Sequence, residues 1–281
     1  MDFTIGTDVE LFAKKGKKFV SSIPFIGSFD TGTKHNPIKF KGGHTLQRDN
    51  VATEFATKVA NNDKEFVRNI RVALKEAVNY VPKGTELQAI SSVIFDNDEL
   101  SHPEAFEFGC DPDFNAWNDG DINPRPCAAN MNLRTAAAHI HIGHPFLKGM
   151  KNKIRMIKMM DCYCGMMSVI LDSSPESLRR KELYGKAGAF RPTSYGVEYR
   201  TLSNFWIKSP EIVSTIYFLT HNALKSLYQN QDKKIISTMG GKDEITGIIN
   251  SGNVKLAEKL LDVKQKDFTT GYASLKKEWK L

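Results

Sequence analysis

The chain opens with Phe3-Thr4-Ile5-Gly6-Thr7-Asp8-Val9-Glu10-Leu11-Phe12, a stretch in which apolar residues recur at every second position. In an extended chain Phe3, Ile5, Val9 and Leu11 point to one side, and Thr4, Asp8, Glu10 and Phe12 point to the other. The stretch therefore predicts a strand that buries one face and carries two carboxylates on the opposite face.

Two later segments repeat this arrangement with other ionisable residues. His139 and His141 lie two apart in the strand candidate 136–143, and Glu198 and Arg200 lie two apart in the candidate 195–202. Side chains two apart on a strand face the same side. A fourth strand candidate, 50–55, contributes Glu54. If these strands share one sheet, a single face carries acids, imidazoles and a guanidinium.

The remaining pattern predicts an α+β fold with an antiparallel sheet, because strands and helices do not alternate regularly. A capping box at Asn62–Glu65 opens one helix, and Ser-Pro-Glu sequences cap two more, at 174 and 209. Further expected elements are a return strand from Phe19, a strand at 87–95, a long helix at 154–171, long loops at 27–48 and 109–130, and short basic helices from Lys242. The sequence has neither a P-loop nor a dinucleotide-binding glycine fingerprint.

The 281 residues carry a formal net charge of +7, which favours anionic partners such as nucleotides, phosphorylated substrates or nucleic acid. Much of the surplus lies late in the chain, in Lys233, Lys234, Lys255, Lys259, Lys264, Lys266, Lys276 and Lys277. The four cysteines, Cys110, Cys127, Cys162 and Cys164, lack zinc-site spacing, so we expect reduced thiols. The start resembles no secretory signal and no apolar run spans a bilayer, so we expect a cytoplasmic protein.

Carboxylates gathered on one face repel each other unless a cation neutralises them. Oxygen ligands with an imidazole suit Mg²⁺ or Mn²⁺, and Mg²⁺ usually shares its coordination shell with substrate phosphates. The pattern thus indicates a metal site beside a nucleotide. Taken singly, each pair could equally be a solvated strand face, and only the three pairs together favour a site.

A group of cations supports phosphate binding, namely Arg179, Arg180, Lys186, Arg191 and Arg200. Guanidinium groups match phosphoryl oxygens, and Gly185 and Gly188 would let backbone approach a ligand. For Arg179 and Arg180 the solvated end of a helix is the alternative.

The order of these motifs resembles the carboxylate–amine ligases of the glutamine synthetase and glutamate–cysteine ligase superfamily, and most closely the phage-type COOH·NH2 ligase type 2. The residues that carry the resemblance are Asp8-Val9-Glu10, Glu54, His139-Ile140-His141-Ile142-Gly143, Arg191, Glu198-Tyr199-Arg200 and Asn204. The resemblance extends from about Asp8 to Trp206, and the shared order of the motifs is more specific than any one motif.

The resemblance implies an ATP-dependent ligase that forms an amide through an acyl phosphate, in the host cytoplasm if a phage encodes it. It implies a curved half-barrel sheet backed by helices in a catalytic domain at 1–230, with a basic helical extension at 231–281. Asp8, Glu10, Glu54, His139 and Glu198 would hold Mg²⁺ or Mn²⁺. The expected ATP-binding residues are His141, Arg180, Lys186, Arg191 and Arg200, and the expected catalytic residues are Arg191, Arg200 and Glu54.

The segment 109–117 resembles the phage-type branch, and Asp111, Asp113 and Asn115, with Asn204, would line a substrate pocket, although an ordinary turn-rich loop explains the segment equally well. The loops 27–48 and 109–130 would exclude water.

Two departures from glutamine synthetase stand out. Asp8 stands where that enzyme has Glu, and its separate N-terminal domain is missing, which puts a ring oligomer and ammonia as substrate in doubt. Two other functions stay open. One is a guanidino-type phosphotransferase of the same fold, which would form no amide. The other is a basic nucleic-acid-binding protein or metal-dependent nuclease, which would need no ATP.

Overall fold

The structure is a computed structural model. It describes residues 2–28, 30–106, 113–124, 132–267 and 274–281. In this part of the chain one large antiparallel sheet forms, with the strand order β3-β4-β5-β1-β11-β13-β12-β8-β9, and β2 and β6 also pair with β1. The bounds of its strands are β1 Thr4–Lys15, β2 Lys18–Val20, β3 Ile38–Lys39, β4 Thr45–Asp49, β5 Ala52–Ala56, β6 Thr85–Gln88, β8 Phe114–Asn115, β9 Asp121–Ile122, β11 Ala138–Gly143, β12 Ala189–Pro192 and β13 Gly196–Tyr199.

A separate two-stranded sheet pairs β7 (Ser92–Ile94) with β10 (Leu133–Thr135). The helices are α1 Asp63–Tyr80, α2 Met150–Met160, α3 Met166–Leu171, α4 Pro175–Arg180, α5 Pro210–Tyr228, α6 Asp232–Thr238, α7 Gly241–Ser251, α8 Val254–Leu261 and α9 Leu275–Trp279. Short 3₁₀ turns, among them η3 (Ala116–Asn118) and η6 (Asn204–Lys208), join some of these elements.

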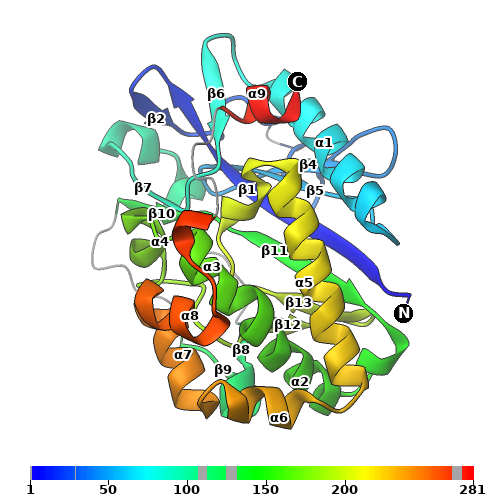
Figure 1. The fold of residues 1–281 in the computed structure, drawn as a ribbon. Coiled ribbons are helices and arrows are strands. Elements are labelled where there is room, and N and C mark those ends of the chain that lie inside the picture. The colour runs from blue at the N-terminus through cyan, green and yellow to red at the C-terminus, as the bar shows by residue number, and fades with distance from the viewer. Residues whose placement is uncertain (1, 29, 107–112, 125–131, 268–273) are drawn as a thin grey trace.

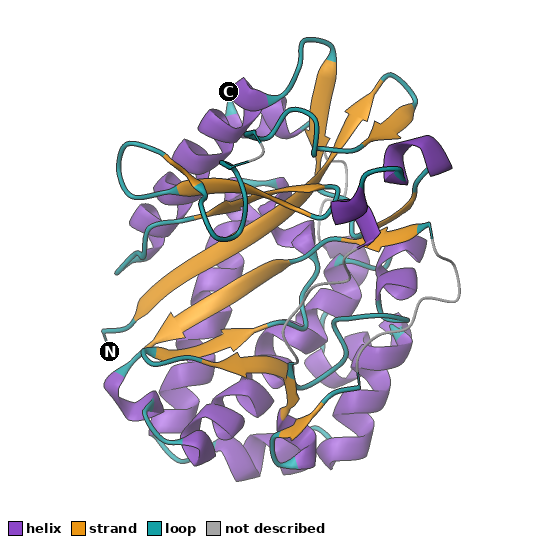
Figure 2. Cartoon of the chain, turned by 180° about the vertical axis from the view of Figure 1, so that it is seen from behind, coloured by secondary structure: helices purple, strands orange, loops and turns teal. Residues whose placement is uncertain are grey.

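The helices gather on one side of the large sheet. In Figure 1, α1, α2 and α5 lie in front of it, and Figure 2 shows the strands from behind with most helices beyond them. Leu11, Ile140 and their alternate neighbours on β1 and β11 are fully buried against this helical layer. The alternation read from the sequence thus places Asp8, Glu10, His139 and His141 on the opposite face.

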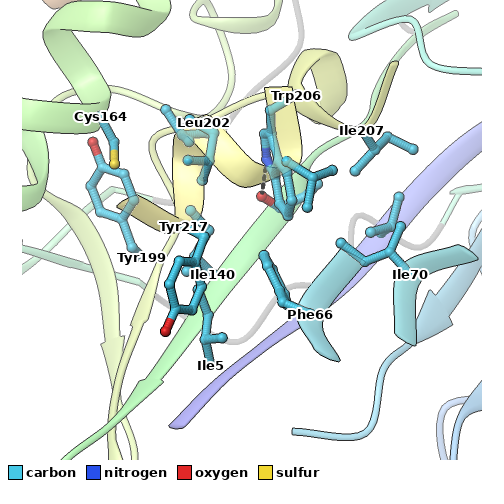
Figure 3. Packing of buried hydrophobic residues seen from close by; sticks show 14 of the residues in the cluster. Ile5, Phe66, Ile70, Ile140, Cys164, Tyr199, Leu202, Trp206, Ile207 and Tyr217 are labelled. Carbon is cyan, nitrogen blue, oxygen red and sulfur yellow. Dashed lines mark hydrogen bonds between the residues drawn. The ribbon is translucent and has the colours of Figure 1, made fainter. Parts of the chain in front are cut away.

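The core between sheet and helices holds several aromatic rings (Figure 3). Phe66 of α1 stacks on Trp206 with ring centroids 5.9 Å apart, and the Trp206 indole nitrogen donates to the Ala138 carbonyl at 3.1 Å. Burying a large apolar side chain stabilises the fold by roughly 1.5–3 kcal/mol. The indole bond additionally ties η6 to β11, one of the strands with polar residues on the open face.

Most of the expected elements are confirmed. Asn62 caps α1 by accepting from the Glu65 amide, Ser174 caps α4 and Ser209 caps α5. The large antiparallel sheet with helices is likewise confirmed, and it is not a closed barrel. Among the described helices, none is both long enough and apolar enough to pass through a bilayer.

The structure differs from the expected local structure at three places. The stretch 27–48 is not all loop, because β4 forms within it and pairs along β5 from Thr45↔Ala56 to Asp49↔Ala52. The strand expected at 87–95 is divided into β6 and β7, which join different sheets. The helix expected at 154–171 contains a π-helical turn, Asp161–Gly165, between α2 and α3.

The cysteine prediction is confirmed for Cys162 and Cys164, which are free and buried in two different apolar clusters. Cys110 and Cys127 lie outside the described residues. The late helices α7 and α8 bury Ile245, Ile249 and Ala257 in a cluster with Met166 of α3. The proposed boundary at residue 230 stays a prediction.

Candidate active site

Strand pairing brings the ionisable pairs into adjacent rows on the open face of the sheet. Asp8 of β1 is opposite His139 of β11, and Glu10 is opposite Glu54 of β5. His141 is opposite Glu198 of β13, which in turn is opposite Arg191 of β12. Five strands, β1, β5, β11, β12 and β13, therefore place their polar side chains side by side.

Asp8 lies between the two histidines. Its carboxylate oxygens are 3.2 Å from His139 Nδ1 and 3.3 Å from His141 Nε2. Burial acts to raise the pKa of Asp8, but the two imidazoles outweigh burial and hold that pKa well below its ordinary value. The same contact with Asp8 raises the pKa of His141 against the opposing effect of burial. Asp8 is thus an ionised carboxylate at neutral pH.

Glu198 lies in the part of the site that contains Arg191 and Arg200. Its Oε1 accepts a close hydrogen bond from Arg200, and Arg191 Nη1 lies 3.9 Å away. Burial acts to raise the pKa of Glu198, but Arg200 and His139 lower it below its ordinary value. Asp113 faces Arg200 from the other side, with its carboxylate 3.8 Å from Arg200 Nε. Both arginines are therefore held at the carboxylate cluster.

His139 and His141 differ in their surroundings. Arg200 Nη1 and the Asp8 carboxylate each lie 3.2 Å from His139 Nδ1, so whether this ring nitrogen donates or accepts depends on the tautomer. Burial and the charge of Arg200 lower the pKa of His139. His141 is more exposed and its Nδ1 lies 2.5 Å from the Tyr195 hydroxyl. One ligand atom each from Asp8, His141 and Glu198 lie within 4.8 Å of one another, a spacing that can hold a metal ion.

Glu10 and Glu54 form an acidic end of the site. Glu10 accepts from the Ala137 amide at 2.8 Å, and Glu54 accepts from Gln47 at 2.9 Å. Burial, together with the charges of Asp49 and Asp8, raises the pKa of Glu10 to about 8. Burial and the neighbouring carboxylates, with Asp49 foremost, raise the pKa of Glu54 well above its ordinary value. Two adjacent buried acids repel each other when both are ionised, and a divalent cation bound between them would remove that cost.

Some expected site residues hold backbone rather than face the acids. Arg180 is buried and donates to the carbonyls of Thr201 at 3.0 Å and Arg200 at 3.2 Å. Asn204 is fully buried and donates to the Glu10 carbonyl at 2.8 Å. Asn115 caps η3 by accepting from the Trp117 amide. The Lys186 side chain is exposed, and Asp111 lies outside the described residues.

Sequence reasoning missed three residues that belong to this region. Asp49 ends β4, where alternation of Thr45, Gln47 and Asp49 could have indicated it. Tyr195 precedes β13 in a turn and carries no pattern of its own. Asp161, in the π-helical turn, accepts from Trp117 Nε1 and the Tyr199 hydroxyl, both at 2.6 Å. It supports β13 from the helical side, between Glu198 and Arg200.

This sheet face brings Asp8, His141 and Glu198 together beside two arginines and two further acids, a set of groups that could bind a divalent cation next to an anion. The family model "Phage phiEco32-like COOH.NH2 ligase-type 2" matches residues 128–243, which include His139, His141, Arg191, Glu198 and Arg200. The expected resemblance to the COOH·NH2 ligase type 2 family is confirmed over that segment.

Among solved structures, the chain is similar to the crystal structure of a bifunctional glutathione synthetase from Pasteurella multocida, with 10% identity and a TM-score of 0.43. The alignment covers 93% of this chain and 49% of that chain, so this chain spans about half the length of that structure. No curated protein sequence matches the chain.

Proposed function

We propose that the chain is an ATP-dependent carboxylate–amine ligase with the catalytic fold of glutamine synthetase, a curved half-barrel backed by helices. The observation that carries the proposal is the convergence of Asp8, His141 and Glu198 with two arginines on one open sheet face. The match of residues 128–243 to a family of carboxylate–amine ligases supports the same reaction class. The basic helices after residue 230 would form an extension outside the catalytic machinery.

The residues fit a hard divalent cation, because the cluster offers carboxylate oxygens and one imidazole. Asp8, His141 and Glu198 would hold Mg²⁺ or Mn²⁺, with His139, Glu10 and Glu54 close enough to complete a larger set. When bound, the cation supplies charge neutralisation for the phosphate oxygens of ATP.

Two arginines would stabilise the phosphoryl group during its transfer. Arg191 and Arg200 would bind the γ-phosphoryl oxygens as they pass from ATP to a substrate carboxylate, releasing ADP. An amine nitrogen would then attack the acyl carbon, phosphate would leave, and the nitrogen would lose a proton to give an amide. Arg180 would act indirectly, by holding the backbone of Arg200. Lys186, exposed on the same segment, would contact the nucleotide.

Product analysis tests this function. Purified protein with ATP and Mg²⁺ is screened against pairs of carboxylates and amines, ADP is measured, and products are weighed by mass spectrometry. A ligase forms ADP only when both substrates are present, and its product has lost one water. A stable phosphoramidate would instead show a phosphotransferase.

The variant Glu198→Gln keeps the shape of the side chain and removes its charge. We expect it to lose at least a hundredfold in ADP formation, whereas Glu182→Gln, on an exposed residue, should match the unmodified chain. Full activity in Glu198→Gln would show that this face is not the site.

A further inference from the structure

The turn between β12 and β13 places a tyrosine hydroxyl against the more exposed of the two histidines. Tyr195 lies in this turn, at residues 193–195, and its hydroxyl is 2.5 Å from His141 Nδ1. The other ring nitrogen, Nε2, lies 3.3 Å from the Asp8 carboxylate. The His141 ring is therefore held at both nitrogens, between a carboxylate of the cluster and a phenol of the turn.

Hydrogen bonds from several directions fix the backbone of this turn. The Thr193 amide donates to the Gly196 carbonyl, and the Gly196 amide donates to the Thr193 hydroxyl, both at 3.1 Å. From the helical layer, the buried Lys153 of α2 donates to the Thr193 carbonyl at 2.6 Å. Directly after β11, the His144 amide donates to the Tyr195 carbonyl at 3.3 Å. The tyrosine thus leaves a backbone that is tied to the helical layer and to β11.

The two contacts of the histidine ring define what the tyrosine can do for it. A neutral imidazole carries one N–H, and its second nitrogen is then an acceptor or a ligand atom. In the proposed metal site His141 Nε2 is the ligand atom, so the proton lies on Nδ1 and is donated to the Tyr195 oxygen. Histidines that bind metals nearly always donate their other N–H in this way, which fixes the orientation of the ring.

The exposure of Tyr195 favours a role at the site over a role in the core. The residue is 50% exposed, so its burial contributes little to the stability of the fold. Its ring centroid lies 6.1 Å from that of His141, at an interplanar angle of 42°. The hydroxyl can therefore be removed without opening a cavity among the buried side chains.

We propose that Tyr195 is a positioning residue for metal binding, because its hydroxyl accepts from His141 Nδ1 and thereby holds Nε2 toward the Asp8 carboxylate. This inference rests on the proposed function, since it takes His141 as a ligand of the divalent cation. It adds a residue that the strand patterns do not predict. Tyr195 lies three positions before Glu198, and in a regular strand residues three apart face opposite sides.

Binding of Mn²⁺ tests this role without any reaction. The affinity is measured on the full chain by electron paramagnetic resonance of free Mn²⁺, with no ATP present. Tyr195→Phe keeps the ring and removes the hydroxyl, and we expect it to weaken Mn²⁺ binding about tenfold. Unchanged affinity in Tyr195→Phe would overturn the proposal.

Tyr228→Phe is the matched control for loss of a tyrosine hydroxyl. Tyr228 is similarly exposed, at 57%, and its ring lies against His144 and Phe146. This variant should bind Mn²⁺ as the unmodified chain does. An equal loss of affinity in Tyr228→Phe and Tyr195→Phe would contradict a specific role for Tyr195.

A second background separates positioning from a general effect on the fold. If the hydroxyl acts through the ring, Tyr195→Phe should change Mn²⁺ affinity less than about twofold once His141→Ala has removed the ring. A tenfold loss that persists in the His141→Ala background would show that Tyr195 does not act through His141. An unchanged affinity in His141→Ala alone would equally overturn the inference, because the ring would then not be a ligand.

The ligase assay distinguishes failure of this inference from failure of the proposed function. In that assay Tyr195→Phe should raise the Mg²⁺ concentration for half-maximal ADP formation about tenfold. If the chain forms amides and Tyr195→Phe binds Mn²⁺ normally, the positioning role fails although the function stands. If no amide forms while Tyr195→Phe weakens Mn²⁺ only in the presence of His141, the ligase function fails although the role of Tyr195 stands.

Discussion

Glu10 and Glu54 are direct cross-strand partners in the β1–β5 pair, so their carboxylates leave the same face of the sheet side by side. Both have raised pKa values, through burial first and neighbouring carboxylates second, and that of Glu10 is about 8. In the unfolded chain a glutamate ionises near pH 4.3. The folded state therefore binds more protons than the unfolded state across the range between these values.

The first prediction concerns this excess of protons. Stability from Glu10 and Glu54 is fully present below about pH 4 and is lost as the pH rises toward 8. With EDTA present, Glu54→Gln should unfold like the unmodified chain at pH 5 but should be more stable at pH 8, by about 1–3 kcal/mol. Urea unfolding at both pH values measures this.

Adding Mg²⁺ provides the internal control for that experiment. A cation stabilises the ionised carboxylates, so Mg²⁺ at pH 8 should stabilise the unmodified chain more than Glu54→Gln. If Glu54→Gln is less stable at pH 8 without metal, the two acids do not repel each other as the geometry indicates.

The second prediction concerns Asp161 in the π-helical turn. Burial raises its pKa from 3.8 to about 6, although Tyr199 and Trp117 donate to it. Its contribution to stability is present below about pH 4 and lost as the pH rises to 6. Relative to Asp161→Asn, the unmodified chain should therefore lose up to about 3 kcal/mol between pH 4 and pH 7. Parallel unfolding curves for the two proteins across this range would refute it, and Asp119→Asn, on an exposed side chain, serves as the control.

The third prediction distinguishes the two histidines. His141, with Asp8 and Glu198, supplies the ligand atoms that lie within 4.8 Å, whereas His139 Nδ1 is in contact with Arg200. We expect His141→Ala to weaken Mn²⁺ binding at least tenfold and His139→Ala to weaken it less. Electron paramagnetic resonance of free Mn²⁺ measures both. A larger loss of Mn²⁺ affinity in His139→Ala would instead support the ligand set expected from the sequence, which includes His139.

The fourth prediction concerns the support of Arg200. Gly185 has φ +73°, and a Cβ there would lie 1.7 Å from Arg180 Nη1, which bonds the Thr201 carbonyl. Gly185→Ala should therefore destabilise the fold by about 3 kcal/mol, combining backbone strain with displacement of a buried guanidinium. Gly16→Ala is the matched control, because φ is +60° and a Cβ there meets no atom within 4 Å. It should lose only about 1 kcal/mol, and equal losses would exclude a role for the Arg180 contact.

The sequence alone predicted the strands that carry the site and the helices with clear caps. Alternation in β1, β11 and β13 is a local property, since successive side chains of any extended segment face opposite sides. It therefore predicted which side chains share a face before any pairing was known. The caps at Asn62, Ser174 and Ser209 are equally local, because each side chain bonds the amide three residues further along the chain.

Only the tertiary structure determined which side chains lie next to each other in the site. Which carboxylates lie beside His139 and His141 depends on the register between β11 and its two partner strands, and local sequence does not encode that register. The pairing of β4 with β5 likewise places Asp49 on the face that carries Glu54. Arg180 and Asn204 donate to the carbonyls of Arg200 and Glu10, contacts 20 and 194 residues apart that the sequence did not predict. Alternation along each strand thus determined which ionisable side chains share one face of the sheet. Long-range packing determined which of these side chains are in contact.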